Sequence, residues 1–219
     1  SSKCFFYFIK MTKIKSDRPI FYVNKIPKAF RAYRPKAIQF LARLMLRVFG
    51  WTIEGRIPEM RENENLVLIA APHTSNWDGF FGFIAIIGLD AKISFFGKHT
   101  LFKKPFLGRF LKYMGGIPVD KNKPGSGLVK EAVENMEKLK GSLIAIAPEG
   151  TRSKTKQWRT GFLHIAEAVD ARIFKAAFDF NTKRIILDNF FIPSGNTEKD
   201  LDKLKIYYSK FSAKKPKNY

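Results

Sequence analysis

The sequence has 219 residues and 45% of them are hydrophobic, which suits a single domain with its own core and excludes a disordered chain. Forty Lys and Arg residues against nineteen Asp and Glu residues give a formal net charge of +21. A chain this basic attracts polyanions such as nucleic acid, an anionic membrane or an acidic carrier protein. The single cysteine, Cys4, excludes an internal disulfide and suits a reducing compartment.

The first 49 residues divide into two predicted segments. Residues 1–35 are basic and interrupted by prolines, which indicates an irregular arm. Residues 36–49 predict a helix with apolar side chains around most of its surface and one narrow polar stripe, made of Lys36, Gln39, Arg43 and Arg47. Such a helix either lies in a membrane interface or packs on the domain core, and the sequence leaves both open. No run reaches the roughly 18 apolar residues that would predict a membrane span.

Strand and helix signals then alternate from residue 50 to residue 213. Apolar runs predict strands at 51–55, 66–71, 92–97, 142–147 and 174–180, with one or two more at 184–192. Helical spacing predicts helices at 80–89, 126–140 and 161–169, and a last one capped by Thr197. Because strands and helices alternate, we expect an α/β single domain with a largely parallel or mixed central sheet flanked by helices, and with an N-terminal basic amphipathic helical arm. Residues 214–219 are expected to be a solvated basic tail.

A polar cluster follows the apolar run at 66–71. Pro72 ends the predicted strand, His73 comes next, and Asp78 follows five residues later. Histidine exchanges a proton near neutral pH, and a carboxylate on its other ring nitrogen would fix its tautomer. His73 and Asp78 are therefore a candidate general base and its orienting partner, with Ser75 as a helix cap. The alternative is a set of capping or surface residues without a catalytic role.

A second polar cluster follows the apolar run at 142–147. Pro148 ends this run, and Glu149-Gly150-Thr151-Arg152-Ser153 come next. If the two strands are parallel, both clusters lie at the carboxyl edge of the sheet, where open α/β sheets bind ligands. Gly150 would let the backbone approach a ligand, and Arg152 offers a planar fork that suits phosphate. The alternative is a surface turn with a solvated arginine.

Together these clusters resemble the glycerolipid acyltransferase family, whose members acylate glycerol phosphate and lysophosphatidic acid. His73 and Asp78 match its motif of a histidine, four residues and an aspartate, and 149–153 match its Glu-Gly-Thr-Arg-Ser motif without change. Residues 115–121 are similar to a third motif, with Lys121 where arginine is usual. Residues 173–177 are similar to a fourth, with Lys175 where the family has proline. The resemblance covers about 50–211 and implies an acyltransferase domain at 50–213.

The resemblance implies an O-acyltransferase that moves a fatty acyl group from a thioester to a hydroxyl of a lysophospholipid such as 1-acyl-glycerol-3-phosphate. His73 would take the proton from that hydroxyl, and Asp78 would hold His73 in place. Backbone amides after Pro72 or at Gly150 are candidate donors to the tetrahedral oxyanion. The implied substrate-binding residues are Glu149, which would bond the glycerol or organise Arg152, and Gly150, Thr151, Arg152, Lys121 and Lys98.

The implied acyl donor is acyl-CoA or acyl carrier protein, with no cofactor. No metal site is expected, because one cysteine and three scattered histidines have no metal-ligand spacing. The implied location is the cytoplasmic face of an anionic membrane, with the chain bound peripherally.

Two other functions stay open. A basic protein could bind anionic lipid or nucleic acid without turnover, or His73 could activate water in an acyl-thioester hydrolase. Nucleic acid is not the expected partner, because no helix-turn-helix, zinc-finger or RNA-recognition signature accompanies the charge.

Overall fold

The chain folds around one mixed sheet. The computed structural model describes residues 25–58, 64–119, 126–138, 141–155 and 157–219, so most of the predicted N-terminal arm and Lys121 lie outside the described residues. Within them, seven strands form a sheet in the order β1-β7-β6-β2-β5-β3-β4. Neighbouring strands are parallel except β6 and β7, which are antiparallel. The predicted α/β fold with a mixed central sheet is therefore confirmed.

The strands are β1 (Thr52–Gly55), β2 (Leu66–Ala71), β3 (Ser94–Lys98), β4 (Gly116–Val119), β5 (Leu143–Ile146), β6 (Arg172–Asp179) and β7 (Arg184–Phe191). The α-helices are α2 (Lys36–Val48), α3 (Asn76–Gly88), α4 (His99–Phe102), α5 (Pro105–Tyr113), α6 (Ser126–Lys138), α7 (Gly161–Ala168) and α8 (Thr197–Tyr208). Two 3₁₀ helices, η1 (Lys28–Phe30) and η2 (Pro216–Asn218), lie near the two ends of the described chain. Helix α8 is capped by Asn196, not Thr197, because the Asn196 side chain accepts a hydrogen bond from the Lys199 backbone N–H at 3.0 Å.

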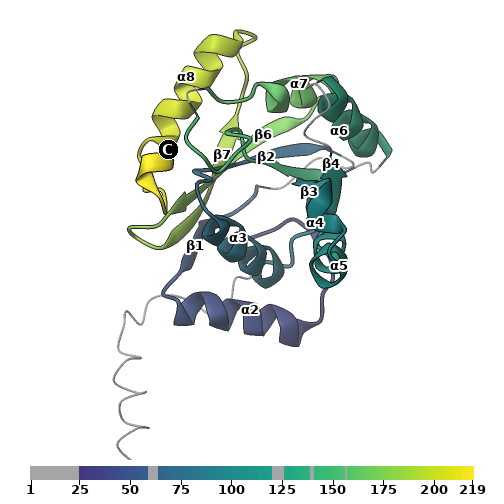
Figure 1. The fold of residues 1–219 in the computed structure, drawn as a ribbon, viewed down its shortest axis with the longest axis vertical. Helices are drawn as coiled ribbons and strands as arrows, with labels where there is room; N and C mark the ends of the chain where they lie inside the picture. Colours follow the sequence, from purple (N-terminus) through teal and green to yellow (C-terminus); the bar gives the residue numbers. More distant parts are fainter. Residues whose placement is uncertain (1–24, 59–63, 120–125, 139–140, 156) are drawn as a thin grey trace, which may run out of the picture.

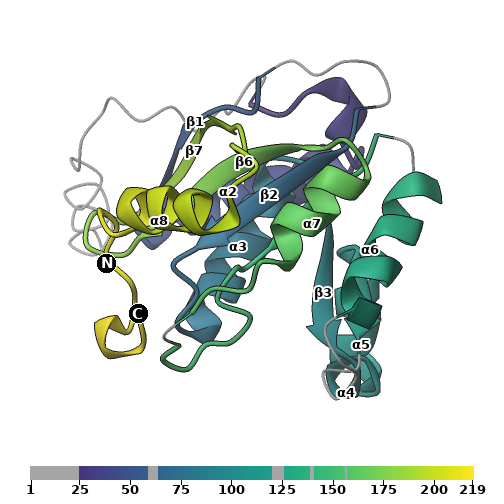
Figure 2. The same ribbon diagram turned by 90° about the horizontal axis from the view of Figure 1, so that it is seen from above.

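Helices cover both faces of the sheet (Figure 1). Helices α2 and α3 lie on one face, over a core that includes Leu46, Phe81 and Phe174. Helices α6, α7 and α8 lie on the other, over a core that includes Ile69, Phe162 and Tyr208. Figure 2 shows this second layer in front of the sheet and α3 behind it. Strand β2 is apolar along its whole length because it is central and covered on both faces.

Helix α2 packs with the middle of its polar stripe, Gln39 and Arg43, toward the protein, and Lys36 and Arg47 at the two ends of the stripe are exposed. Gln39 is buried and donates a hydrogen bond to the Arg34 carbonyl, and Arg43 donates one to the Gly88 carbonyl at the end of α3. Ala42 and Leu46 lie on the buried side as well and pack in the core, whereas most other apolar side chains of α2 point outward, and Leu41 and Val48 are 60% and 74% exposed. The wider apolar surface of α2 therefore faces away from the core. None of the described helices is long and apolar enough to cross a bilayer.

The two polar clusters meet because β2 and β5 are adjacent and parallel, with Leu66 opposite Leu143 and Ile69 opposite Ile146. Both strands end at the same edge of the sheet, and β3 ends there too, on the other side of β5. The segments after these strands therefore share the carboxyl edge, as the sequence predicts.

Candidate active site

His73 and Asp78 form a contacting pair in the first turn after β2. His73 Nδ1 lies 3.4 Å from Asp78 Oδ2, and the Asp78 side chain is fully buried. The His73 side chain is 29% exposed, so its ring is open to solvent on one side. Because Asp78 engages Nδ1, Nε2 is the nitrogen that remains for an incoming hydroxyl.

Asp78 is held by the start of helix α3 as well as by His73. Its Oδ2 accepts hydrogen bonds from the backbone N–H groups of Thr74 at 2.6 Å and Ser75 at 2.7 Å. Ser75 is the N-cap of α3, and its hydroxyl donates to Asp78 Oδ1 at 2.9 Å while accepting from the Trp77 N–H. This capping box explains the motif spacing, since a Ser three residues before an Asp satisfies the free N–H groups of a helix start. The expected capping role of Ser75 is confirmed.

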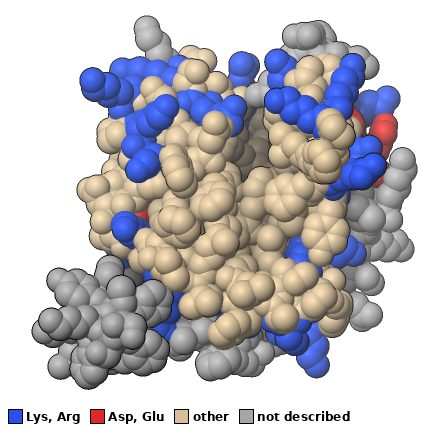
Figure 3. Space-filling view, turned by 60° about the horizontal axis from the view of Figure 1, so that its bottom comes forward, with Lys and Arg blue, Asp and Glu red and all other residues tan. Residues whose placement is uncertain are grey.

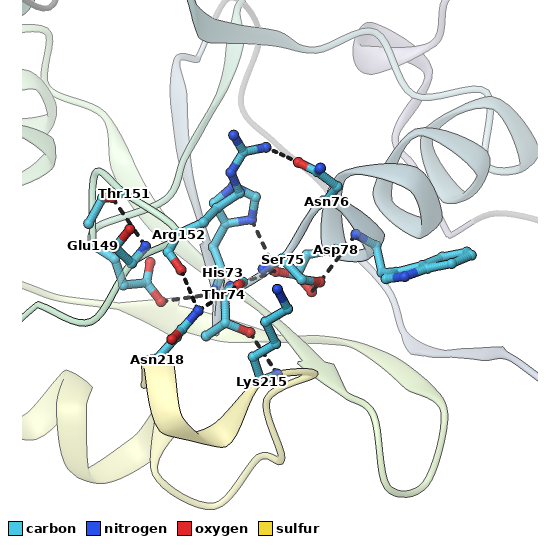
Figure 4. Close-up of polar contacts among 12 residues, drawn as sticks. His73, Thr74, Ser75, Asn76, Asp78, Glu149, Thr151, Arg152, Lys215 and Asn218 are labelled. Carbon is cyan, nitrogen blue, oxygen red and sulfur yellow. Dashed lines mark hydrogen bonds and ion pairs between the residues drawn. The ribbon is translucent and has the colours of Figure 1, made fainter.

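Glu149 connects the second cluster to the first. Its Oε1 accepts a hydrogen bond from the His73 backbone N–H at 2.9 Å (Figure 4). Its Oε2 is buried and has no hydrogen-bond partner among the described residues. Burial raises the pKa of Glu149, and the smaller effect of hydrogen bonds from the backbone N–H groups of Glu149 and His73 opposes this rise. Glu149 thus fixes the backbone that carries the histidine.

Arg152 is held by Asn76 rather than by Glu149. Its Nη1 donates a hydrogen bond to Asn76 Oδ1, at the first residue of α3, and Figure 4 shows the Arg152 guanidinium on the same side of the loops as the His73 ring. Glu149 bonds the His73 backbone and Arg152 bonds Asn76, so the described residues show no direct contact from Glu149 to Arg152, and a bond from Glu149 to the glycerol stays a prediction. Asn76 lies inside the first motif, but the sequence gave no sign of a role for its side chain, because its partner Arg152 is 76 residues away in the chain.

The C-terminal segment touches both clusters, which the sequence did not predict. Asn218 Nδ2 donates to the Thr74 carbonyl at 3.4 Å and to the Arg152 carbonyl at 3.0 Å. The Lys215 backbone N–H donates to the Thr74 hydroxyl at 3.1 Å (Figure 4). The lysine side chains of 214–217 are exposed, as expected of a basic tail. The segment is nevertheless bound to the candidate active site by the hydrogen bonds of Lys215 and Asn218.

The remaining predicted residues are placed as follows. Gly150 has a φ of +64°, and a side chain there would bring its Cβ to 3.1 Å from the Arg159 Cγ, so glycine suits both the backbone and the space. Thr151 accepts a hydrogen bond from the Ser153 N–H at 3.2 Å, which shapes the same loop. Lys98 ends β3 at this edge and is exposed.

The backbone amides suggested as oxyanion donors are already engaged. The N–H groups of His73, Thr74 and Ser75 donate to Glu149 or Asp78. The Gly150 N–H donates to the Ala147 carbonyl at 3.0 Å. In this arrangement the amides stabilise the two loops themselves, and the donor to the oxyanion stays a prediction. Within the described ranges, no three His, Cys, Asp or Glu side chains gather as a metal site would require.

Comparison with known proteins places this arrangement in a family. The Acyltransferase family model matches residues 52–178, more than half of the chain. A 1-acyl-sn-glycerol-3-phosphate acyltransferase of Bacillus subtilis is 31% identical over 91 residues, 41% of this chain and 45% of that protein. One of Streptococcus pneumoniae is 26% identical over 136 residues, 58% of this chain and 49% of that protein. This chain therefore matches about half the length of these relatives.

A solved structure has a similar fold. The crystal structure of the 1-acyl-sn-glycerophosphate (LPA) acyltransferase PlsC from Thermotoga maritima matches with a TM-score of 0.53 and 18% identity, over 82% of this chain and 81% of that one. The family model spans both the His73–Asp78 pair and the 149–153 loop. The chain belongs to the glycerolipid acyltransferase family that these two motifs indicate.

Proposed function

We propose that this protein is an O-acyltransferase that transfers a fatty acyl group from a thioester donor to the free hydroxyl of 1-acyl-glycerol-3-phosphate. The names of the relatives in Bacillus subtilis and Streptococcus pneumoniae support this acceptor. The observation that carries the proposal is the half-open imidazole of His73, held through Nδ1 by a buried carboxylate at the carboxyl edge of the sheet. Acyl-CoA or acyl carrier protein is the proposed donor.

His73 Nε2 removes the proton of the acceptor hydroxyl as its oxygen attacks the thioester carbonyl. The tetrahedral intermediate then expels the thiol, and the proton on His73 is delivered to the leaving sulfur. Asp78 stabilises the imidazolium between these steps. The Ser75 hydroxyl is engaged in capping α3, so no acyl-serine intermediate is proposed.

Arg152 is the proposed partner of the acceptor phosphate. Its guanidinium is exposed and carries a fork of N–H donors that matches a phosphate group. The hydrogen bond to Asn76 occupies only Nη1 of Arg152, and Asn76 is three residues after His73 in the sequence. A phosphate on Arg152 would thus place the glycerol of the same molecule near the imidazole.

The proposed setting is the surface of an anionic membrane. Exposed apolar side chains of three helices form what we call the apolar face. It is made of Ile38, Phe40, Leu41, Leu44, Met45 and Val48 from α2, Phe49 directly after α2, Trp77 and Phe80 from α3, and Phe106, Leu107, Phe110 and Tyr113 from α5. Uncharged side chains fill the middle of this side of the molecule, and Lys and Arg side chains lie around its margin (Figure 3). An apolar surface with a basic rim suits a membrane with acidic headgroups. Binding to the cytoplasmic face of the membrane stays a prediction.

The test is product analysis with one labelled acyl-CoA, with and without 1-acyl-glycerol-3-phosphate. Phosphatidic acid is expected only when the acceptor is present. His73→Ala should lower the rate by about 100-fold to 10,000-fold, the usual cost of losing a general base. His164→Ala is the matched control, because His164 is exposed on α7 and contacts Thr160 and neither polar cluster, and it should leave the rate unchanged.

Three outcomes decide between functions. Free fatty acid formed without acceptor would indicate a hydrolase instead. No product with either acyl-CoA or acyl carrier protein would indicate a binding protein. A folded His73→Ala variant with near-normal transfer would refute His73 as the base.

A further inference from the structure

A basic pocket lies at the opposite edge of the sheet from the candidate active site. It is lined by Lys28, Ala29, Arg31, Ala32, Tyr33, Arg34, Lys92 and Tyr113, and its volume is about 500 Å³. Lys92 comes just before β3 and Tyr113 just before β4, so the pocket is at the amino ends of these strands. His73 and Glu149, in contrast, follow the carboxyl ends of β2 and β5. The pocket is open to solvent and not enclosed.

The charge of this pocket favours the binding of an anion. Four of its lining residues are cationic and none is acidic. Arg34 pairs with the buried Asp90, and Arg31 donates a hydrogen bond from Nε to the Ile26 carbonyl at 3.1 Å. Cations that share one pocket repel each other, and a bound anion would relieve that repulsion.

Arg34 is fixed at the pocket before any ligand arrives. It is 8% exposed, its backbone N–H donates to Asp90 Oδ1 at 2.9 Å, and its Nη1 donates to the Ala91 carbonyl at 2.9 Å. Gln39 of α2 donates to the Arg34 carbonyl at 2.7 Å. The pocket wall is therefore tied to both α2 and the end of α3, and little ordering would be needed on binding.

Two tyrosines stand at the pocket with exposed rings. Tyr33 is 75% exposed and has a φ of +56°, a left-handed conformation that is unfavourable for a bulky residue. Such strain tends to persist where a residue has a binding role. Tyr113 is 63% exposed and ends α5, whose outer side belongs to the apolar face. Exposed tyrosines beside apolar surface are typical of the membrane–water boundary.

The position of the pocket favours a lipid over a soluble anion. Helix α2 begins two residues after Arg34 and ends beside Phe80 of α3, where Phe49 contacts it at 6.2 Å between ring centroids. Its 13 residues span about 20 Å, so the apolar face has the candidate active site near one end and the basic pocket near the other. A headgroup bound here belongs to a different lipid from the one at His73.

We infer that this pocket binds the phosphate of an anionic membrane lipid that is not the acyl acceptor, and that this headgroup holds the far end of the apolar face against the membrane. The inference rests on the membrane setting proposed above but not on acyl transfer. An assay without acyl donor therefore tests it separately from catalysis.

The test is co-sedimentation of the full chain with phosphatidylcholine vesicles, with and without phosphatidylglycerol. Lys28→Gln with Lys92→Gln removes two exposed pocket charges and leaves the buried Arg34 in place. This pair should weaken binding to the phosphatidylglycerol vesicles about 30-fold, from roughly 1 kcal/mol per lysine at the surface. The matched control, Lys203→Gln with Lys210→Gln, removes two exposed charges from the region of α8 on the other face of the sheet, and should cost less than about threefold.

Three results would overturn the inference. Equal losses in the two double variants would mean that only net charge matters. Unchanged vesicle binding after loss of Lys28 and Lys92 would mean that no headgroup occupies the pocket. If the pocket variant lost affinity for inorganic phosphate in solution but kept its vesicle binding, the ligand would be a soluble anion.

Discussion

Replacing Asp78 by asparagine separates the two tasks that one buried carboxylate performs. Asp78 accepts hydrogen bonds from the Thr74 N–H, the Ser75 N–H and the Ser75 hydroxyl, and it pairs with His73 Nδ1 at 3.4 Å. Asparagine has nearly the same shape and keeps one acceptor oxygen for the two N–H groups. The Ser75 hydroxyl can turn to accept from the new amide. What the substitution removes is the negative charge.

The expected cost follows from these contacts. A hydrogen bond to a charged group contributes about 1.5 to 3 kcal/mol and a neutral one about 0.5 to 1.5, a difference of about 1 to 1.5 kcal/mol, so three weakened bonds should lower the free energy of unfolding by about 3 to 4.5 kcal/mol. The rate should fall by about 100-fold to 10,000-fold, because the imidazolium loses its counter-charge and the histidine its fixed tautomer. Both losses are large enough to measure independently.

The assay is a double-mutant cycle with His73→Ala, read by acyl-transfer rate and by urea unfolding. If Asp78 acts in catalysis only through His73, Asp78→Asn should have almost no further effect on the rate of the His73→Ala variant. Its effect on the free energy of unfolding should be nearly the same in both backgrounds. The reasoning is refuted if Asp78→Asn transfers acyl groups at a near-normal rate. It is refuted equally if its rate loss is undiminished without His73.

Three further predictions concern Glu149, Asn218 and α2. Burial raises the pKa of Glu149 above its unfolded value, so the ionisation of Glu149 opposes folding as the pH rises. Glu149→Gln should therefore raise the free energy of unfolding, measured in urea, more at neutral than at acidic pH. A larger increase at acidic pH would contradict this reasoning. Asn218→Ala should raise KM for the acceptor more than it lowers kcat in initial-rate kinetics, because Asn218 connects Thr74 to Arg152 through hydrogen bonds. Lys217→Ala is the control. An unchanged KM in the Asn218→Ala variant would contradict this prediction. Leu41→Asp should weaken vesicle binding and change the free energy of unfolding by no more than about 0.5 kcal/mol. Ile206→Asp on α8, where the side chain is similarly exposed, should leave vesicle binding intact. Equal vesicle binding by the two variants would contradict a membrane role for the apolar face.

The convergence of the two motifs was predictable because β2 and β5 carry strong signals. Each is a continuous apolar run that ends at a proline, and continuous apolar runs are typical of strands buried on both faces. Parallel strands bring their following segments to one edge whatever the rest of the chain does. His73, Asp78 and Glu149 therefore follow from local sequence and one topological rule, and the structure places them together.

The orientation of α2 was not predictable in the same way. Periodicity reveals that Gln39 and Arg43 share a stripe, but it does not say which side of a helix meets the protein. Here the carbonyl at Gly88 and the backbone at Arg34 supply partners for those polar groups, and these partners come from distant or irregular segments. The contacts of Asn218 have the same character, since Thr74 is 144 residues away and no spacing rule relates them.

The outward apolar side of α2 also bears on how an acceptor lipid would reach the histidine. Phe49 at the end of α2 meets Phe80, and Phe80 meets Trp77 at 5.6 Å between ring centroids, so aromatic side chains run from α2 to the first turn of α3. Trp77 is the neighbour of Asp78, whose carboxylate holds His73. A lipid with its acyl chain along these rings would keep that chain in the membrane while its glycerol stood at the imidazole and its phosphate at Arg152. The protein then needs to desolvate only the hydroxyl and the thioester, which agrees with a site formed by two loops at a sheet edge.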